Sequence, residues 1–155
     1  ENLAALFRAL LAALLLILRI VLFIAAPVAL VASIVFINHV RFRRKISRMT
    51  AAEPRKCVLL MYRYFLKLLS LLGFNLDSYE TAADFSKRLI TNYSGDMNAF
   101  AAITDIFMKA RYSINEMSED EKAEYVKFLD YLLSETESRL GKYRFMLMKY
   151  ILGII

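Results

Sequence analysis

A long stretch near the N-terminal end of the chain is almost free of charge. Between residues 3 and 37 the only charged side chains are those of Arg8 and Arg19, and the eighteen residues 20–37 carry none. A helix needs about 20 apolar residues to cross the hydrocarbon of a bilayer. The pattern therefore predicts a membrane helix over residues 1–40, with its span at about 20–37.

Proline and arginine residues add detail to this membrane helix. Pro27 predicts a kink, because prolines inside membrane helices bend them more often than they end them. Nothing between Leu3 and Ala26 signals a turn, so one long helix is expected rather than a hairpin of two. Arg8 and Arg19 are eleven residues apart, close to three turns, and therefore share one face. That face meets either the outer headgroups or other membrane helices.

After the span, helical periodicity predicts four helices. The first follows Thr50-Ala-Ala-Glu53, a capping box that places Pro54 in the first turn, and it ends at Gly73. Its polar residues form one narrow stripe of Arg63, Lys67 and Ser70. A helix that is apolar nearly all round belongs in the middle of a packed structure, so this is the expected core helix.

Capping signals also mark the later helices. Thr81-Ala-Ala-Asp84 begins a short helix that ends near Ser94-Gly95, a third runs from about Asp96 to Tyr112, and Ser118 caps a fourth. No alternating strand pattern is present. The predicted fold class is therefore all-α, a long N-terminal transmembrane helix followed by a small cytosolic bundle of about four helices over residues 54–140.

The last fifteen residues, 141–155, form an apolar and basic tail. This tail is too short to span a bilayer and too apolar to hang free in water. Two placements are open. The tail packs over the core helix, or it lies in the inner membrane interface with Lys142, Arg144 and Lys149 among the headgroups.

Positive charge is concentrated directly after the span. The net charge is +6, and a basic juxtamembrane linker is expected over residues 41–53. Its membrane-orienting residues are Arg41, Arg43, Arg44, Lys45 and Arg48. Cations next to a span mark the cytosolic side and attract anionic headgroups, at about 1 kcal/mol each near the surface. We therefore expect the N-terminus outside, the helical domain in the cytosol, a bilayer with anionic headgroups as partner, and no nucleic acid.

The sequence contains no recognisable combination of a nucleophile with a base, and no cluster of metal-binding residues. Cys57 is the only cysteine, and the only histidine, His39, lies eighteen residues before it. The acidic run 119–121 is explained by the dipole of the helix that it begins. We therefore expect no catalytic, cofactor-binding or metal-binding residues and no enzyme activity. Cys57 is expected to be a packed residue, with a reactive thiol near a helix start as the alternative.

Three segments of the chain stand out together: Tyr62…Leu68-Leu69…Leu72-Gly73, Thr81-Ala82-Ala83-Asp84-Phe85 and Ala110-Arg111-Tyr112-Ser113. They resemble a known family, the C-terminal helical domain of bacterial transglutaminase-like membrane proteins. The family usually reads Thr-Pro-x-Glu where this chain has Thr-Ala-Ala-Asp, a change that keeps the capping chemistry. The resemblance covers residues 20–135, including the membrane helix with its basic exit.

This resemblance implies an anchoring role and a class of partner. In large family members, further membrane helices and an extracytoplasmic domain with a Cys-His-Asp triad lie upstream. An ATPase of the MoxR type is a candidate partner by family analogy. Arg111 and Tyr112, at the end of the third helix, form the candidate partner surface, the alternative being a helix-end cation and a packed tyrosine.

The function expected from these patterns is a non-catalytic membrane anchor and cytosolic interaction domain of the bacterial inner membrane. The chain begins with Glu1 rather than Met, so we expect it to be the C-terminal part of a larger transglutaminase-like membrane protein. The alternative is a stand-alone small membrane protein whose helical bundle mediates assembly of a membrane complex. An enzymatic role would depend on Cys57.

Overall fold

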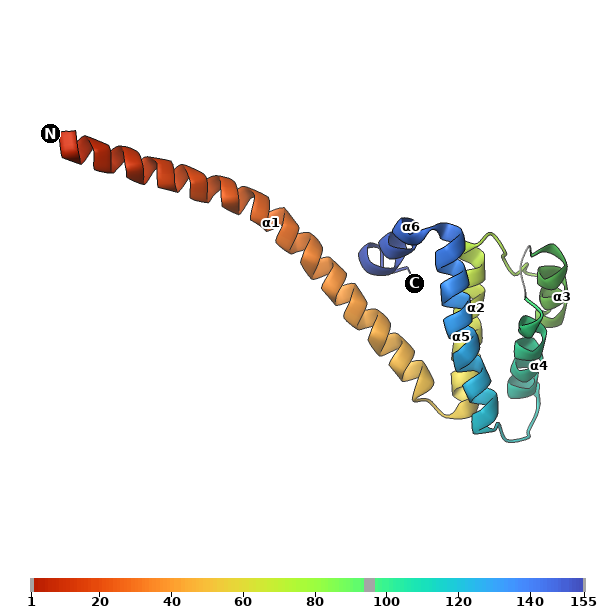
Figure 1. The fold of residues 1–155 in the computed structure, drawn as a ribbon. Coiled ribbons are helices and arrows are strands. Elements are labelled where there is room, and N and C mark those ends of the chain that lie inside the picture. Colours follow the sequence, from red (N-terminus) through yellow and green to blue (C-terminus); the bar gives the residue numbers. More distant parts are fainter. Residues whose placement is uncertain (1, 94–96, 155) are drawn as a thin grey trace.

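Helices make up most of the part of the chain that the structure describes. The computed structural model describes residues 2–93 and 97–154, apart from the side chains of residues 2–6 and 9. The helices, in chain order, are α1 (Asn2–Thr50), α2 (Pro54–Leu71), α3 (Ala82–Asn92), α4 (Ala99–Tyr112), α5 (Glu119–Leu140), α6 (Lys142–Met146) and the π-helical turn η1 (Leu147–Ile151). The described residues contain no strand (Figure 1). This confirms the all-α prediction with one long, apolar N-terminal helix.

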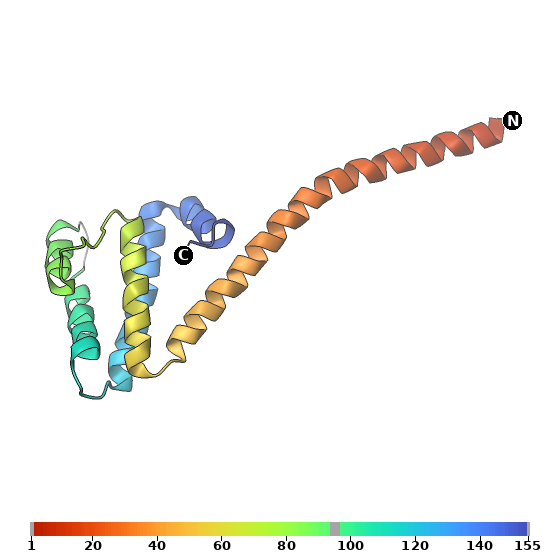
Figure 2. The same cartoon turned by 180° about the vertical axis from the view of Figure 1, so that it is seen from behind.

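Helix α1 stands apart from the other helices over most of its length (Figures 1 and 2). It is 49 residues long, contains Pro27 and bends about half-way along (Figure 1). Among the described residues it alone is long and apolar enough to cross a membrane. Its apolar side chains from Leu10 to Ile34 are not buried by the rest of the protein. The helix also continues through residues 41–50, so most of the expected linker is rigid.

The predicted capping box at Thr50 is wrong. Thr50 is the last residue of α1, and its hydroxyl donates to the carbonyl oxygens of Ile46 and Ser47, both at 3.1 Å. The N-cap of α2 is Glu53, which makes no side-chain cap bond, and Pro54 follows it in the first turn. The threonine hydroxyl bonds back to the turn before it instead, as threonine often does within helices.

Helix α2 forms the centre of the helical domain, by which we mean α2–α5. It packs against both α5 and α4, and its buried residues occupy most of its circumference. Aromatic rings fill both contacts. Tyr62 stacks on Phe107 of α4 with ring centroids 3.9 Å apart, and Phe65 lies against Tyr125 and Phe128 of α5 at 5.5 and 5.1 Å. Such pairs add to the burial of apolar area that holds the three helices together.

The ends of these helices are defined by capping residues. After α2, Gly73 has a φ of +92°, and the N–H groups of Gly73 and Phe74 bond to the carbonyls of Ser70 and Leu69. That pair of bonds is a Schellman motif, which ends a helix at a glycine. Ser118 and Glu121 form a reciprocal capping box at the start of α5. Thr81 accepts a bond from the N–H of Asp84 at the start of α3.

The tail folds back onto α1. The side chain of Asn38 donates to the carbonyl oxygens of Tyr150 and Ile151, at 2.9 and 3.0 Å. The ammonium of Lys149 lies 4.2 Å from the ring centroid of Phe42, a cation–π distance. The tail therefore bridges the gap between α1 and the end of α5 (Figure 2).

Arg55 joins the start of α2 to the end of α4. Its guanidinium donates to the carbonyl oxygens of Ala110, Ser113 and Asn115, at 3.1, 2.8 and 2.7 Å. The last carbonyls of a helix have no partner within the helix, so an arginine from another element satisfies them. In the structure, Arg55 therefore closes this corner of the domain.

We predict that Arg55→Ala lowers the free energy of unfolding by on the order of 2 kcal/mol, because hydrogen bonds from a charged group are lost at partly buried carbonyls. Thermal unfolding in mild detergent, followed by near-ultraviolet circular dichroism, measures the change. The matched control is Lys56→Ala, which removes an equal charge from the exposed neighbouring position. Equal midpoints for the two variants would contradict the assignment.

Candidate functional site

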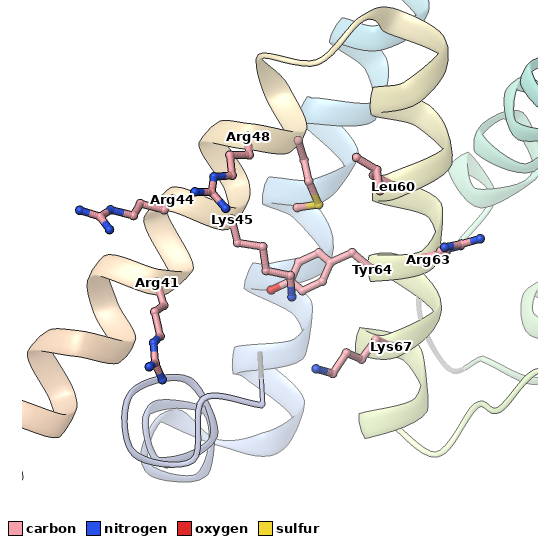
Figure 3. Close-up of a pocket in the computed structure, with 9 residues that line it drawn as sticks. Arg41, Arg44, Lys45, Arg48, Leu60, Arg63, Tyr64 and Lys67 are labelled. Carbon is pink, nitrogen blue, oxygen red and sulfur yellow. The ribbon is translucent and has the colours of Figure 1, made fainter.

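The first candidate surface is a basic cleft between the end of α1 and α2 (Figure 3). Its volume is about 560 Å³. It is lined by Arg41, Arg44, Lys45, Arg48 and Met49 from α1 and by Leu60, Arg63, Tyr64 and Lys67 from α2. Four of the five predicted membrane-orienting residues therefore line one hollow, together with cations of α2. Arg43 is exposed but is not part of the lining.

The lining of this cleft contains six cations and no acidic residue. The ammonium of Lys45 lies 4.0 Å from the ring centroid of Tyr64. Burial, and to a smaller extent the nearby charge of Lys67, lower the pKa of Lys45. Figure 3 shows Lys45, Tyr64 and Lys67 directed into the gap, whereas the guanidinium of Arg63 points away from it. The arrangement favours an anion at this position.

Tyr64 adds an unpaired hydrogen-bonding group to the cleft. Its side chain is 3% exposed, and its hydroxyl has no hydrogen-bond partner among the described residues. Burial raises the pKa of this hydroxyl, so it stays protonated and can donate. Most buried polar groups in proteins have a partner, so a phenol without one needs an explanation.

The second candidate surface is a groove of about 770 Å³ on another side of α2, which we call the domain groove. Its floor includes Leu59, Leu66 and Phe107. The candidate partner residues Arg111 and Tyr112 line it and are both exposed. The guanidinium carbon of Arg111 lies 6.0 Å from the ring centroid of Phe107 and 5.7 Å from that of Tyr112.

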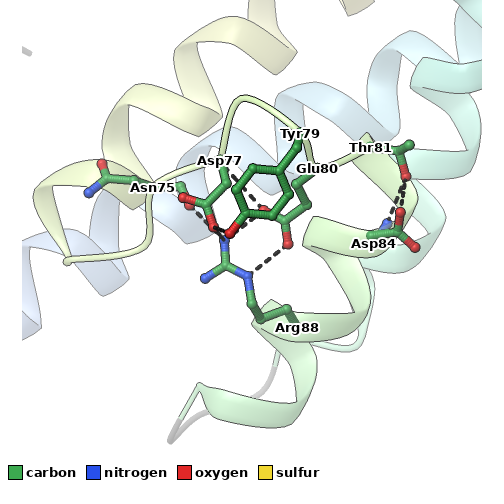
Figure 4. A network of polar contacts seen from close by, with 7 residues as sticks. All are labelled: Asn75, Asp77, Tyr79, Glu80, Thr81, Asp84 and Arg88. Atoms are coloured by element: carbon green, nitrogen blue, oxygen red, sulfur yellow. Dashed lines mark hydrogen bonds and ion pairs between the residues drawn. The ribbon is translucent and has the colours of Figure 1, made fainter.

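One wall of the domain groove is a loop held by Arg88 of α3 (Figure 4). The guanidinium donates to both carboxylate oxygens of Glu80, each at 2.7 Å, and to the carbonyl oxygen of Asn75, also at 2.7 Å. Asp77 accepts a longer contact from Arg88 at 3.9 Å and a hydrogen bond from Tyr79 at 3.5 Å. A bidentate arginine–carboxylate pair fixes both distance and angle, so it sets the position of this wall.

Cys57 and His39 lie in different surroundings. The thiol of Cys57 is fully buried, with its sulfur 3.8 Å from that of Met61, and burial raises its pKa. The ring of His39 packs against Tyr150 of the tail, with centroids 5.7 Å apart. The described part of the chain contains no group of three or more His, Cys, Asp or Glu residues that could hold a metal ion.

Comparison with protein-family models, with curated proteins and with solved structures finds no match to this chain. The functional argument therefore rests on the two surfaces. Sequence reasoning identified Arg111 and Tyr112 of the domain groove and the α1 side of the basic cleft. It missed Tyr64 and Lys67 as part of that cleft. The available signal was the narrow polar stripe on α2, which includes Lys67.

We predict that the wall of the domain groove loosens in acid. The hydrogen bond from Arg88 lowers the pKa of Glu80. A carboxyl whose pKa is lowered by folding contributes fully above its ordinary pKa of about 4.3, and the contribution is lost as the pH falls through the lowered value. Amide resonances of residues 76–79, followed by NMR during acidification, should shift or broaden in that range.

The matched control is Glu80→Gln, which keeps the size of the side chain and removes its ionisation. Its loop resonances should already differ from wild type near neutral pH and should change less on acidification. An identical acid response in the two proteins would assign the effect to another group and remove Glu80 as the residue that fixes the wall.

Proposed function

We propose that this chain is a non-catalytic membrane anchor and interaction domain of the bacterial inner membrane, with its N-terminus outside and a four-helix bundle in the cytosol. One observation carries the docking role. The three segments that resemble the transglutaminase-like family are far apart in the sequence, yet each contributes to the domain groove. The contributions are Tyr62 from the first, Thr81 and Ala82 from the second, and Ala110, Arg111 and Tyr112 from the third.

The chemistry of the domain groove indicates the kind of partner. An apolar floor takes apolar side chains, and the rim carries Arg55, Arg63 and Arg111 against the single acid Glu80. Arg55 is already engaged with the end of α4, so Arg63 and Arg111 remain for a partner. The fitting partner is a protein segment that combines apolar and acidic side chains. An ATPase of the MoxR type is the candidate that the family resemblance names.

The anchoring role rests on the continuity of α1. The same helix contains the apolar stretch and the basic residues 41–48, so the charged segment follows the span without a flexible joint. The tail adds exposed apolar side chains beside α1 at Asn38, one residue after the span, including Leu147 and Leu152 at 46% and 55% exposure. Apolar side chains flanked by cations are typical of segments that lie in the membrane interface. Of the two placements open for the tail, we therefore favour the interfacial one.

We predict that a photo-crosslinking residue in place of Tyr112 captures one specific cytosolic protein in intact cells. Arg111→Glu should reduce that product strongly, because it places a like charge against an acidic segment. The control position is Tyr143 in the tail, which is 90% exposed but lies away from the domain groove. Identical products from the two positions, or a product insensitive to Arg111→Glu, would count against docking in the groove.

A second function, assembly of a membrane complex, is favoured by the length of the apolar stretch. From Leu10 to Ile37 the helix is roughly 40 Å long, whereas the hydrocarbon core is about 30 Å thick. Arg19 lies about 27 Å before Ile37 on the helix axis, near the outer boundary of the hydrocarbon. The exposed leucines before it, such as Leu10 and Leu14, then extend beyond the hydrocarbon. Other membrane helices, or a second copy of this chain, would cover them.

For assembly we predict a complex larger than one chain after extraction in mild detergent, measured by sedimentation velocity. Leu14→Arg should reduce the size of that complex, because a charge on the covering face is costly to bury. The control is Ile114→Arg, which places the same charge at a 98% exposed side chain outside α1 and should leave the size of the complex unchanged. A monomeric wild-type protein would remove this second function.

A further inference from the structure

The basic cleft contains charges that no salt bridge among the described residues neutralises. The described residues form five salt bridges, and none of them involves the six cations of the cleft. Lys45 and Lys67 approach each other closely enough for the second to disfavour the charged form of the first. Like charges held together on two packed helices destabilise the protein unless an anion lies between them.

Tyr64 supplies an independent sign of a ligand. Its unpartnered hydroxyl lies in the same cleft, on the helix that also carries Lys67. Figure 3 shows its ring directed from α2 toward Lys45. A buried hydroxyl without a partner costs free energy, and an anion in the cleft would accept a hydrogen bond from it. Two ammonium groups and one phenol therefore line the same cleft.

The orientation of the cleft indicates where the anion comes from. The narrow end lies at the turn between α1 and α2, beside Arg48 and Leu60, and the wide end lies at Arg41 and Lys67 (Figure 3). Arg41 follows the apolar span by four residues, about 6 Å along the helix, which is the depth of the headgroup layer. The cleft thus opens toward the membrane surface, where phosphate groups are concentrated.

We propose that the basic cleft binds the phosphate of an anionic phospholipid headgroup. The ammonium groups of Lys45 and Lys67 and the hydroxyl of Tyr64 donate to the phosphate oxygens, and Arg41 borders the entrance. This inference rests on the proposed membrane anchoring. It adds a discrete site to the general attraction that any basic segment has for an anionic membrane.

The experiment uses the full chain in a neutral detergent. Short-chain phosphatidylglycerol is titrated in while thermal unfolding is followed by near-ultraviolet circular dichroism. A ligand that binds only the folded state raises the unfolding midpoint in a saturable way. We expect this with phosphatidylglycerol and not with phosphatidylcholine of the same chain length, inorganic phosphate or polyglutamate.

A pair of matched double variants tests the site itself. Lys45→Gln/Lys67→Gln should weaken phosphatidylglycerol binding by about tenfold or more, since it removes two charge-assisted hydrogen bonds. Arg43→Gln/Lys56→Gln removes the same two charges from the same helices, at two exposed positions outside the lining of the cleft. It should retain most of the affinity.

Tyr64→Phe tests the site in a second way, through its stability without lipid and its gain in stability with lipid. Without lipid this variant should be as stable as wild type or more stable, because it removes a buried hydroxyl that has no partner. With phosphatidylglycerol it should gain less stability than wild type. A purely structural role for Tyr64 would leave the gain from lipid unchanged and would overturn its part in the site.

Several outcomes would overturn the proposal. Equal losses in the two double variants would mean diffuse attraction without a site. Equal stabilisation by inorganic phosphate would mean a free anion, and tighter binding of polyglutamate would mean an acidic protein segment. Alkaline carbonate extraction of membranes distinguishes a failure of the proposed anchoring from a failure of the proposed phosphate site. Release of the chain by carbonate would contradict the anchoring. A chain that stays in the membrane but is not stabilised by phosphatidylglycerol would contradict only the phosphate site.

Discussion

The burial of α2 on two sides is the constraint on which the rest of the structure depends. Tyr62 faces α4, Phe65 faces α5, and both contacts are aromatic and closely packed. With those sides occupied, the remaining face of α2, with Tyr64 and Lys67, turns toward α1 and forms one wall of the basic cleft. The cleft is thus a consequence of core packing, and its cations are brought together by contacts that they do not make themselves.

A like-charged cleft must also be kept from opening. Only three residues, 51–53, separate α1 from α2, so the narrow end is fixed by chain connectivity. The wide end is bridged by the tail, through Asn38 and through Lys149 over Phe42. Buried Met49 and the partly buried Phe42 and Ile46 extend the core onto α1. Apolar contact and two hydrogen bonds therefore hold six cations near one another without an ion pair from the described part of the chain.

The sequence was informative where a local rule decides the structure and misleading where a distant element does. Gly73 and Ser118 end and begin helices as their types predict, because capping depends on neighbours within a few residues. The capping box predicted at Thr50 was wrong because α1 continues through the expected linker, where the hydroxyl of Thr50 bonds to carbonyls of the preceding turn. Arg55, Tyr64 and Lys67 have no local signature. Arg55 acts at α4, 55 to 60 residues away, and the other two acquire their roles only when α2 packs beside α1.

The two candidate surfaces lie on different sides of one helix, and Arg63 borders both. Because α2 is packed against α4 and α5 and fixed at its ends by Arg55 and the Schellman motif at Gly73, the spacing between the two surfaces is set by the core. A lipid phosphate held on one side would thus fix the height and rotation of the domain groove above the membrane. Under the two proposals, placement of a partner at a defined distance from the bilayer would require no moving part, because one central helix lies between the two candidate surfaces.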